Sequence, residues 1–263
     1  VSLSEGVTKD RVEEILNVLI ARHEALRTRF VTVGSSVYQQ VEEECPFRVE
    51  ALKDTSHQQG LLKTFVRPFD LSVAPLVRAG YIRSKEGTSG KLIIDLHHII
   101  SDGISQEILR NEFNALLEGE VLPDVLYQYK DYVAWQQSPE WQAQKKKEES
   151  YWLETLSGEL PILELPTDYS RPKVQSHEGG VLSMSLPPEQ VSALRSLAEQ
   201  EGVTLFMVLL SLWKVLLSRI SNQEELLVGV AVSGRRHTDV EKIVGMFVNT
   251  VVIRSKASSQ MSY

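Results

Sequence analysis

The chain has 263 residues, of which 42% are hydrophobic and 24% charged, so it can form one large domain or two smaller ones with a buried core. Its formal net charge of −7 argues against the basic surface that a nucleic acid or an anionic membrane selects. With one cysteine, Cys45, the sequence excludes an internal disulfide and a cysteine-based zinc site, which suits the cytoplasm.

The first predicted element is a helix over residues 10–30. Its apolar residues recur at helical spacing, at Val12, Ile15, Leu16, Leu19 and Leu26. Asp10 and Glu13 can form a capping box at its start. His23 lies on the apolar stripe, which favours a hydrogen-bonded core histidine over a catalytic one.

A strand over 35–43, a short helix that ends before Pro68 and a strand over 75–84 follow. Lys91 to Ile100 is short and rich in β-branched residues, and this predicts a strand buried on both faces. A helix over 105–119, which ends at Gly119, comes next.

Two adjacent histidines, His97 and His98, lie at the end of the predicted 91–100 strand. Because side chains alternate along a strand, the two imidazoles are expected to point in opposite directions. Either imidazole could accept a proton, since histidine titrates near neutral pH. Asp102 can cap the following helix and pair with an arginine, and Gly103 permits a close approach to the backbone.

The segment has three other interpretations. A metal site is disfavoured, although His, His and Asp are all good ligands, because adjacent strand histidines diverge and no third clustered His or Cys is evident. A serine hydrolase would need a G-x-S-x-G turn, which the sequence lacks. Two buried structural histidines remain an even alternative from this segment alone.

The second half of the chain begins with a Pro- and Gly-rich stretch, which predicts a linker. A strand within 181–190, helices over 188–202 and 204–221, and strands over 225–234 and 244–255 are expected beyond it. The most apolar window, 203–217, contains Lys214 and is shorter than a bilayer crossing needs, so no membrane span is expected.

The segment "HHIISDG" at 97–103 resembles the HHxxxDG signature of nonribosomal peptide synthetase condensation domains, which belong to the chloramphenicol-acetyltransferase-like superfamily. Three further segments resemble motifs of this family in the same order: "RHEALRTRF" at 22–30, "YKDYVAWQ" at 129–136 and "VGMFVNTVVIR" at 244–254. The resemblance therefore extends over essentially the whole chain.

The resemblance implies an α/β fold of two chloramphenicol-acetyltransferase-like lobes that form a V around a tunnel. The expected domains are an N-terminal lobe at 1–157, an interlobe linker at 158–180 and part of a C-terminal lobe at 181–263. It also implies amide formation between a peptidyl or acyl thioester donor and an aminoacyl acceptor. Both substrates would be held on the phosphopantetheine of donor and acceptor peptidyl carrier domains, beside an adenylation domain, with no cofactor or metal of the chain's own.

By the same resemblance, His98 is the catalytic histidine, either a general base or a group that positions the amine. His97, Asp102, Gly103 and Arg27 support it, with Arg27 paired to Asp102 through the bidentate geometry that arginine offers a carboxylate.

Ser105 and Asn249 are candidate tunnel residues. Arg235 and Arg236 of "SGRRH" are candidate contacts for the pantetheine phosphate, with a solvated loop as the alternative.

The motifs favour the subtype that joins an L-configured donor to an L-configured acceptor. An epimerization-type domain, a catalytically idle domain of a synthetase and a coenzyme A-dependent acyltransferase remain alternatives. The segments that carry the family's first motif and its last motifs are missing, so the chain is expected to be a fragment with about half of the second lobe.

Overall fold

The computed structural model describes the chain except residues 54–57, 84–89, 175, 177–178 and 257–263. The chain forms two compact units. Unit 1 contains residues 1–145 and 231–249, and unit 2 contains residues 146–230 and 250–263. Residues 231–249, predicted in the C-terminal lobe, belong to unit 1, and residues 146–157, predicted in the N-terminal lobe, belong to unit 2. The boundaries of the lobes stay a prediction.

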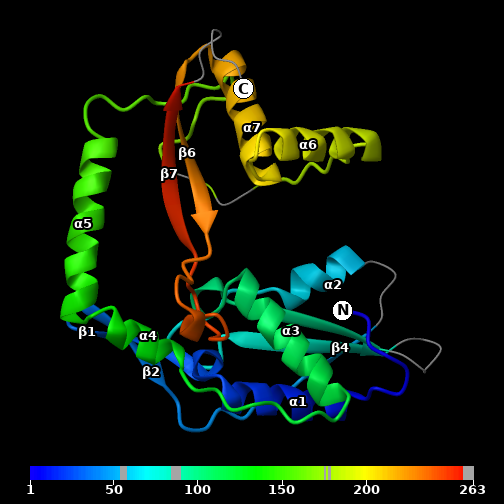
Figure 1. The fold of residues 1–263 in the computed structure, drawn as a ribbon. Coiled ribbons are helices and arrows are strands. Elements are labelled where there is room, and N and C mark those ends of the chain that lie inside the picture. Colours follow the sequence, from blue (N-terminus) through cyan, green and yellow to red (C-terminus); the bar gives the residue numbers. More distant parts are fainter. Residues whose placement is uncertain (54–57, 84–89, 175, 177–178, 257–263) are drawn as a thin grey trace. The chain divides into compact units, whose positions relative to one another are not determined.

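A three-stranded mixed sheet forms the centre of unit 1 (Figure 1). Strand β3 (Glu50–Leu52) pairs parallel with β4 (Val77–Arg83), and β4 pairs antiparallel with β5 (Gly90–Leu96). Strands β1 (Thr28–Val33) and β2 (Ser36–Val41) form a separate antiparallel hairpin.

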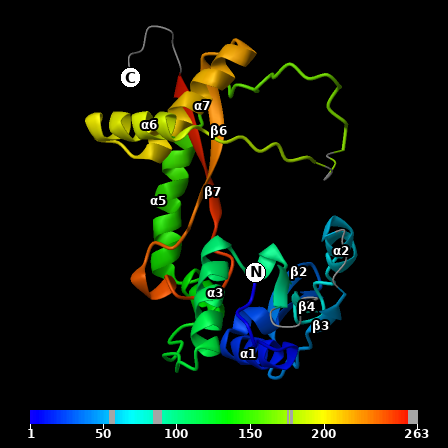
Figure 2. The same ribbon diagram turned by 90° about the vertical axis from the view of Figure 1, so that its right-hand side faces the viewer.

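Two helices, α1 (Lys9–Arg22) and α3 (Gly103–Leu117), pack against each other and against the sheet, whereas α2 (Gln58–Phe65) lies on the other side (Figure 2). The apolar stripe of α1 is buried as predicted, through Val12, Ile15, Leu16, Leu19 and Ile20. Thr8, and not Asp10, caps α1, because the Thr8 hydroxyl accepts the backbone N–H of Arg11.

The predicted helix over 10–30 is wrong beyond Arg22. The chain turns through the short 3₁₀ helix η1 (Glu24–Arg27) and enters β1, whose backbone pairs with β2. Cross-strand pairing therefore outweighs the helical pattern of the "RHEALRTRF" residues. His23 is buried, with 1% of its surface exposed, and its Nε2 lies 2.7 Å from Glu112 on α3, as expected for a core histidine.

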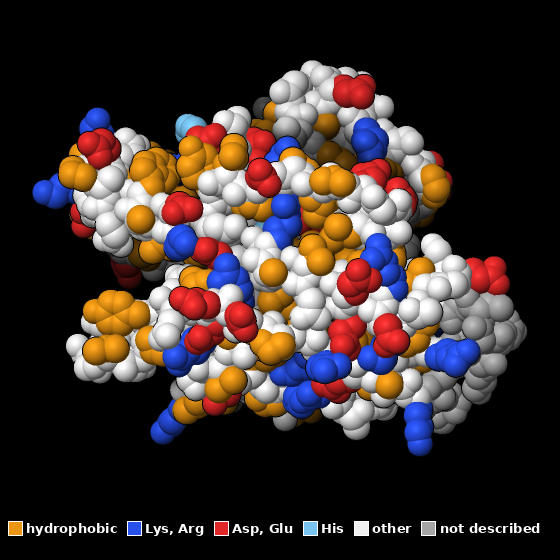
Figure 3. All heavy atoms as spheres, turned by 90° about the horizontal axis from the view of Figure 1, so that it is seen from below, with side chains coloured by type: hydrophobic (Ala, Val, Ile, Leu, Met, Phe, Trp, Pro, Cys, Tyr) orange, Lys and Arg blue, Asp and Glu red, His pale blue; other side chains and the backbone are white. Residues whose placement is uncertain are grey.

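Helix α4 (Tyr129–Trp135) lies in unit 1, and α5 (Pro139–Thr155) continues from unit 1 into unit 2. Unit 1 also contains the short 3₁₀ helix η3 (Thr238–Val240). On the face in Figure 3, acidic and basic side chains are interspersed.

Unit 2 contains α6 (Pro188–Gln200), α7 (Leu205–Ser221) and the paired strands β6 (Glu225–Val232) and β7 (Asn249–Lys256), whose end residues 231–232 and 249 belong to unit 1. The predicted strand within 181–190 is absent, and its apolar side chains are exposed. Within the described ranges no single helix is long and apolar enough to cross a membrane, although the bent pair α6 and α7 satisfies length and composition together.

Candidate active site

The strand that carries the histidine motif ends earlier than its composition predicts. Strand β5 stops at Leu96, and residues 98–100 form the 3₁₀ helix η2 (His98–Ile100). The imidazole Nδ1 of His97 accepts the backbone N–H of Ile99, at 3.1 Å, and the His97 carbonyl accepts that of Ile100. These bonds turn the backbone out of the sheet, so strand alternation does not set the directions of the two imidazoles.

The two imidazoles nevertheless have different surroundings. His97 is partly buried and meets the ring of Phe69 edge-on, with ring centroids 6.0 Å apart. His98 is exposed, and its Nδ1 lies 2.7 Å from the carbonyl oxygen of Ser101. Because a carbonyl can only accept, Nδ1 of His98 must carry the proton, and Nε2 of the neutral ring keeps its lone pair.

Asp102 is fully buried and caps α3, as its position in the sequence predicts. Its carboxylate accepts the backbone N–H of Ser105 at 2.7 Å and that of Phe247 at 3.1 Å. Burial raises the pKa of Asp102, but the hydrogen bonds from Ser105, the charge of Arg235 and the Phe247 N–H outweigh it and lower the pKa below its ordinary value of 3.8. The carboxylate is therefore charged at neutral pH.

The predicted pairing of Asp102 with Arg27 is wrong. Arg235 is the partner, with its Nη2 3.1 Å and 3.3 Å from the two carboxylate oxygens. Arg27 instead donates to the backbone carbonyl of Glu42 and lies 3.6 Å from the carboxylate of Glu24, because the η1 turn directs its side chain there. The Arg235 side chain is only 3% exposed, so Arg235 is not available as the predicted phosphate contact.

Ser105 does not line an open tunnel as predicted, because it is fully buried within unit 1. Its hydroxyl lies 2.7 Å from Asp102 Oδ1, 2.8 Å from the Gly245 carbonyl and 3.0 Å from both the Gly245 N–H and Arg235 Nη2. Ser105 therefore connects the start of α3 to the 244–248 segment. Asn249 is exposed at the start of β7, and its role in a tunnel stays a prediction.

The 244–248 segment is a buried loop and not part of the predicted strand over 244–255. Its backbone groups bond to Asp102, Ser105 and Tyr129 in place of a neighbouring strand, including a Tyr129 hydroxyl that donates to the Met246 carbonyl at 2.7 Å. Gly245 is required here, because a Cβ atom would lie 2.2 Å from the Tyr129 ring. We call residues 233–248, which connect β6 to β7, the anchoring loop.

Gly103 is different from Gly245. It is exposed as the first residue of α3, and a Cβ atom there would meet no atom within 4 Å. The fold of unit 1 therefore does not require a glycine at this position. Since Asp102 caps the N–H of Ser105, the N–H groups of Gly103 and Ile104 are the first-turn donors that the helix itself does not use.

Sequence reasoning missed Arg235 and Tyr129 as parts of this site. "SGRRH" and "YKDYVAWQ" were noted, but nothing in their spacing shows that they lie beside Asp102 and the anchoring loop. Within the described parts of the chain, no three His, Cys, Asp or Glu side chains gather as metal ligands.

Comparisons with known proteins bear on the family and the fold of this chain. The family model described as Condensation domain matches residues 1–262. Gramicidin S synthase 2 of Brevibacillus brevis is 42% identical over 267 residues, which cover 100% of this chain and 6% of that protein. Tyrocidine synthase 3 of Brevibacillus parabrevis is 41% identical over 264 residues, 99% of this chain and 4% of that protein.

A solved condensation domain from Monacolin K polyketide synthase superposes with a TM-score of 0.81 at 18% identity, and the match covers 97% of this chain and 61% of that one. The predicted α/β fold of the chloramphenicol-acetyltransferase-like class is thereby confirmed. The chain spans only a small part of these curated relatives and about three fifths of the solved domain.

Proposed function

The chain belongs to the condensation-domain family, and on that premise we propose that it forms an amide bond between two carrier-bound substrates in nonribosomal peptide synthesis. The donor would be a peptidyl or acyl thioester, and the acceptor an aminoacyl thioester. Each would be held on the phosphopantetheine of a peptidyl carrier domain, with an adenylation domain as neighbour. The observation that carries the proposal is the exposed His98 ring with its Nδ1 held at 2.7 Å from the Ser101 carbonyl.

In this proposal His98 acts through Nε2. The acceptor's α-amine attacks the donor carbonyl carbon, and Nε2 accepts a proton from the amine nitrogen. The tetrahedral intermediate then collapses, the carbon–sulfur bond breaks, and the thiolate leaves as a thiol with the proton that His98 returns. The bond to Ser101 fixes the ring and its tautomer, so no reorganisation of the imidazole is needed.

The backbone N–H of Gly103 would donate a hydrogen bond to the carbonyl oxygen of the donor substrate. The oxygen that gains negative charge needs a hydrogen-bond donor, and the exposed first-turn N–H groups of α3 supply donors at a helix N-terminus. The open space around the Cα of Gly103 leaves room for the thioester. His97, Asp102 and Arg235 would hold the turn without touching the substrate.

Amide formation can be tested with the 263-residue chain and two carrier proteins loaded with defined L-aminoacyl groups. We expect His98→Ala to lower the rate of amide formation by about 10²-fold or more, the range of a lost general base. His177→Ala, in the predicted interlobe stretch, is the matched control. No amide from the parent chain would contradict the proposal and favour a catalytically idle module.

The same assay separates the alternatives. Turnover of coenzyme A thioesters without carriers would favour a coenzyme A-dependent acyltransferase. Exchange of the acceptor's α-proton without amide formation would favour an epimerization-type domain. We propose the subtype that joins L-donor to L-acceptor, and faster reaction of a D-configured donor would contradict it. A cytoplasmic location remains a prediction.

A further inference from the structure

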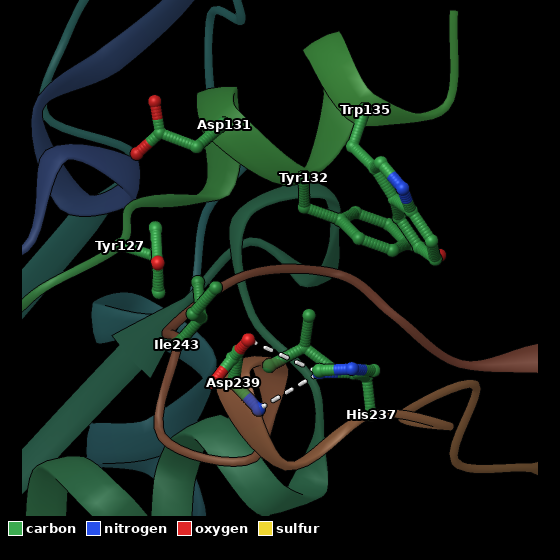
Figure 4. Close-up of a pocket in the computed structure, with 8 residues that line it drawn as sticks. Tyr127, Asp131, Tyr132, Trp135, His237, Asp239 and Ile243 are labelled. Atoms are coloured by element: carbon green, nitrogen blue, oxygen red, sulfur yellow. Dashed lines mark hydrogen bonds and ion pairs between the residues drawn. The ribbon is translucent and has the colours of Figure 1, made fainter. Parts of the chain in front are cut away.

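Unit 1 contains a pocket that is separate from residues 97–103, which we call the histidine turn. It has a volume of about 360 Å³ and lies between α4 with its preceding residues and the η3 region of the anchoring loop (Figure 4). We call it the aromatic pocket. Its lining includes Tyr127, Tyr132, Trp135, Asp131, Asp239 and His237. The volume is at the small end of the range for ligand sites, which suits one side chain and not a large cofactor.

Hydrogen bonds hold both walls of the aromatic pocket in place. On the loop side, Arg235 Nη1 donates to the carbonyl of Val240 at 2.6 Å and to that of Ile243 at 2.7 Å. On the helix side, Tyr129 donates to the Met246 carbonyl, and Asp131 accepts the backbone N–H of Gln128 at 2.8 Å. The pocket therefore exists before any ligand enters, which lowers the entropic cost of binding.

Aromatic rings form one side of the pocket. Tyr132 and Trp135 project from adjacent turns of α4 with ring centroids 6.0 Å apart, and Figure 4 shows both rings on the same side of the helix. Trp135 is 45% exposed and Tyr127 48% exposed. Exposed Tyr and Trp around a concave surface are typical of protein interfaces, where they contribute more binding energy than most residues.

Carboxylates complete the pocket. Asp131 and Asp239 are both exposed, and no lysine or arginine is among the described residues that line it. Asp239 Oδ2 lies 3.2 Å from Nδ1 of the exposed His237, a contact with a modest energy at the surface. Asp131 already accepts the Gln128 N–H, but a purely apolar occupant would remove the remaining acceptor sites of both carboxylates from water without replacing those hydrogen bonds, which is unfavourable.

We propose that the aromatic pocket receives an arginine side chain from a partner polypeptide. A guanidinium group is flat, stacks on tyrosine and tryptophan rings, and can donate two hydrogen bonds to one carboxylate. A lysine ammonium offers neither the flat face nor the paired donors. Two basic side chains next to the pocket have partners elsewhere, since Lys130 bonds to Glu24 and Arg235 bonds to Asp102. Arg236 is also close enough for its charge to act on Tyr132. Arginine binding in this pocket involves no acyl transfer, so the binding experiment tests it independently of the proposed amide formation.

The test compares two peptides that differ only in charge. The probes are acetyl-Ala-Arg-Ala-amide and the same peptide with neutral citrulline in place of arginine, titrated into the 263-residue chain at low salt. NMR follows the indole N–H signals, with that of Trp135 assigned by its loss in Trp135→Phe. We expect the arginine peptide to shift the Trp135 signal and to bind at least fivefold more tightly than the citrulline peptide.

Variants locate the binding site. Asp239→Asn should weaken arginine-peptide binding at least threefold, whereas Asp124→Asn, which removes an exposed carboxylate outside the pocket, should change it less than twofold. Trp213 on α7 is 53% exposed and serves as the matched reporter. Equal binding of the two peptides, or equal shifts at Trp213 and Trp135, would overturn the proposal. The peptide comparison uses the parent chain and remains decisive if a variant does not fold.

Discussion

The buried ion pair between Asp102 and Arg235 gives the sharpest prediction. Asp102→Asn keeps the shape of the side chain and one oxygen for the Ser105 N–H. It replaces the other oxygen, Oδ2, with an NH₂ group, which donates where the Phe247 N–H and Arg235 Nη2 also donate. The substitution therefore leaves a buried arginine charge without its partner and at least one N–H group without an acceptor.

The magnitude follows from burial. Asp102 is fully buried and the Arg235 side chain is 3% exposed, so water cannot replace the lost partner. Removing one member of a buried pair typically costs about 3–5 kcal/mol, and we expect Asp102→Asn to lower the free energy of unfolding of unit 1 by about that amount. Asp10→Asn, at a side chain that is 93% exposed, is the matched control and should change it by less than about 0.5 kcal/mol.

Urea unfolding followed by hydrogen exchange at unit 1 amides measures this effect separately from unit 2. Because the folded-state pKa of Asp102 is below its ordinary value, its contribution is present above pH 3.8 and is lost as the pH falls through the folded pKa. The parent should therefore lose more stability on acidification than Asp102→Asn does. Equal unfolding free energies for Asp102→Asn and Asp10→Asn would refute the assigned role of the pair.

Three further predictions concern unit 1. Gly245→Ala should destabilise it by about 2 kcal/mol or more in the same unfolding measurement, because the new methyl group overlaps the Tyr129 ring. Gly103→Ala should leave stability within about 0.5 kcal/mol of the parent but slow amide formation; an unchanged rate would contradict the proposed role of Gly103. Burial raises the pKa of Glu112, but the interactions of its carboxylate with His23 and Arg22 outweigh burial and lower the pKa below its ordinary value of 4.5. Glu112→Gln should therefore lose less unfolding free energy than the parent as the pH falls below 4.5. The same pH dependence in both proteins would contradict a stabilising contact between Glu112 and His23.

The sequence by itself determined the elements whose pattern is local. The apolar stripe of α1, the capping of α3 by Asp102 and the helical α7 all depend on residues within a few positions of one another. The four ordered motifs also identified the family, since motif order is a property of the sequence alone. In the same way, the position of His98 within the HHxxxDG motif made it the candidate catalytic histidine.

Only the tertiary structure decided which distant residues meet. Arg27 and Arg235 are equally able to pair with a carboxylate, and the direction of the η1 turn and the packing of the anchoring loop select Arg235. The histidine turn and the 244–248 loop both have strand-like sequence patterns. Their backbone N–H groups donate instead to side-chain acceptors, including His97, Asp102 and Ser105. A strand-like pattern cannot reveal such partners, because hydrogen bonds between distant segments depend on the fold and not on local propensity.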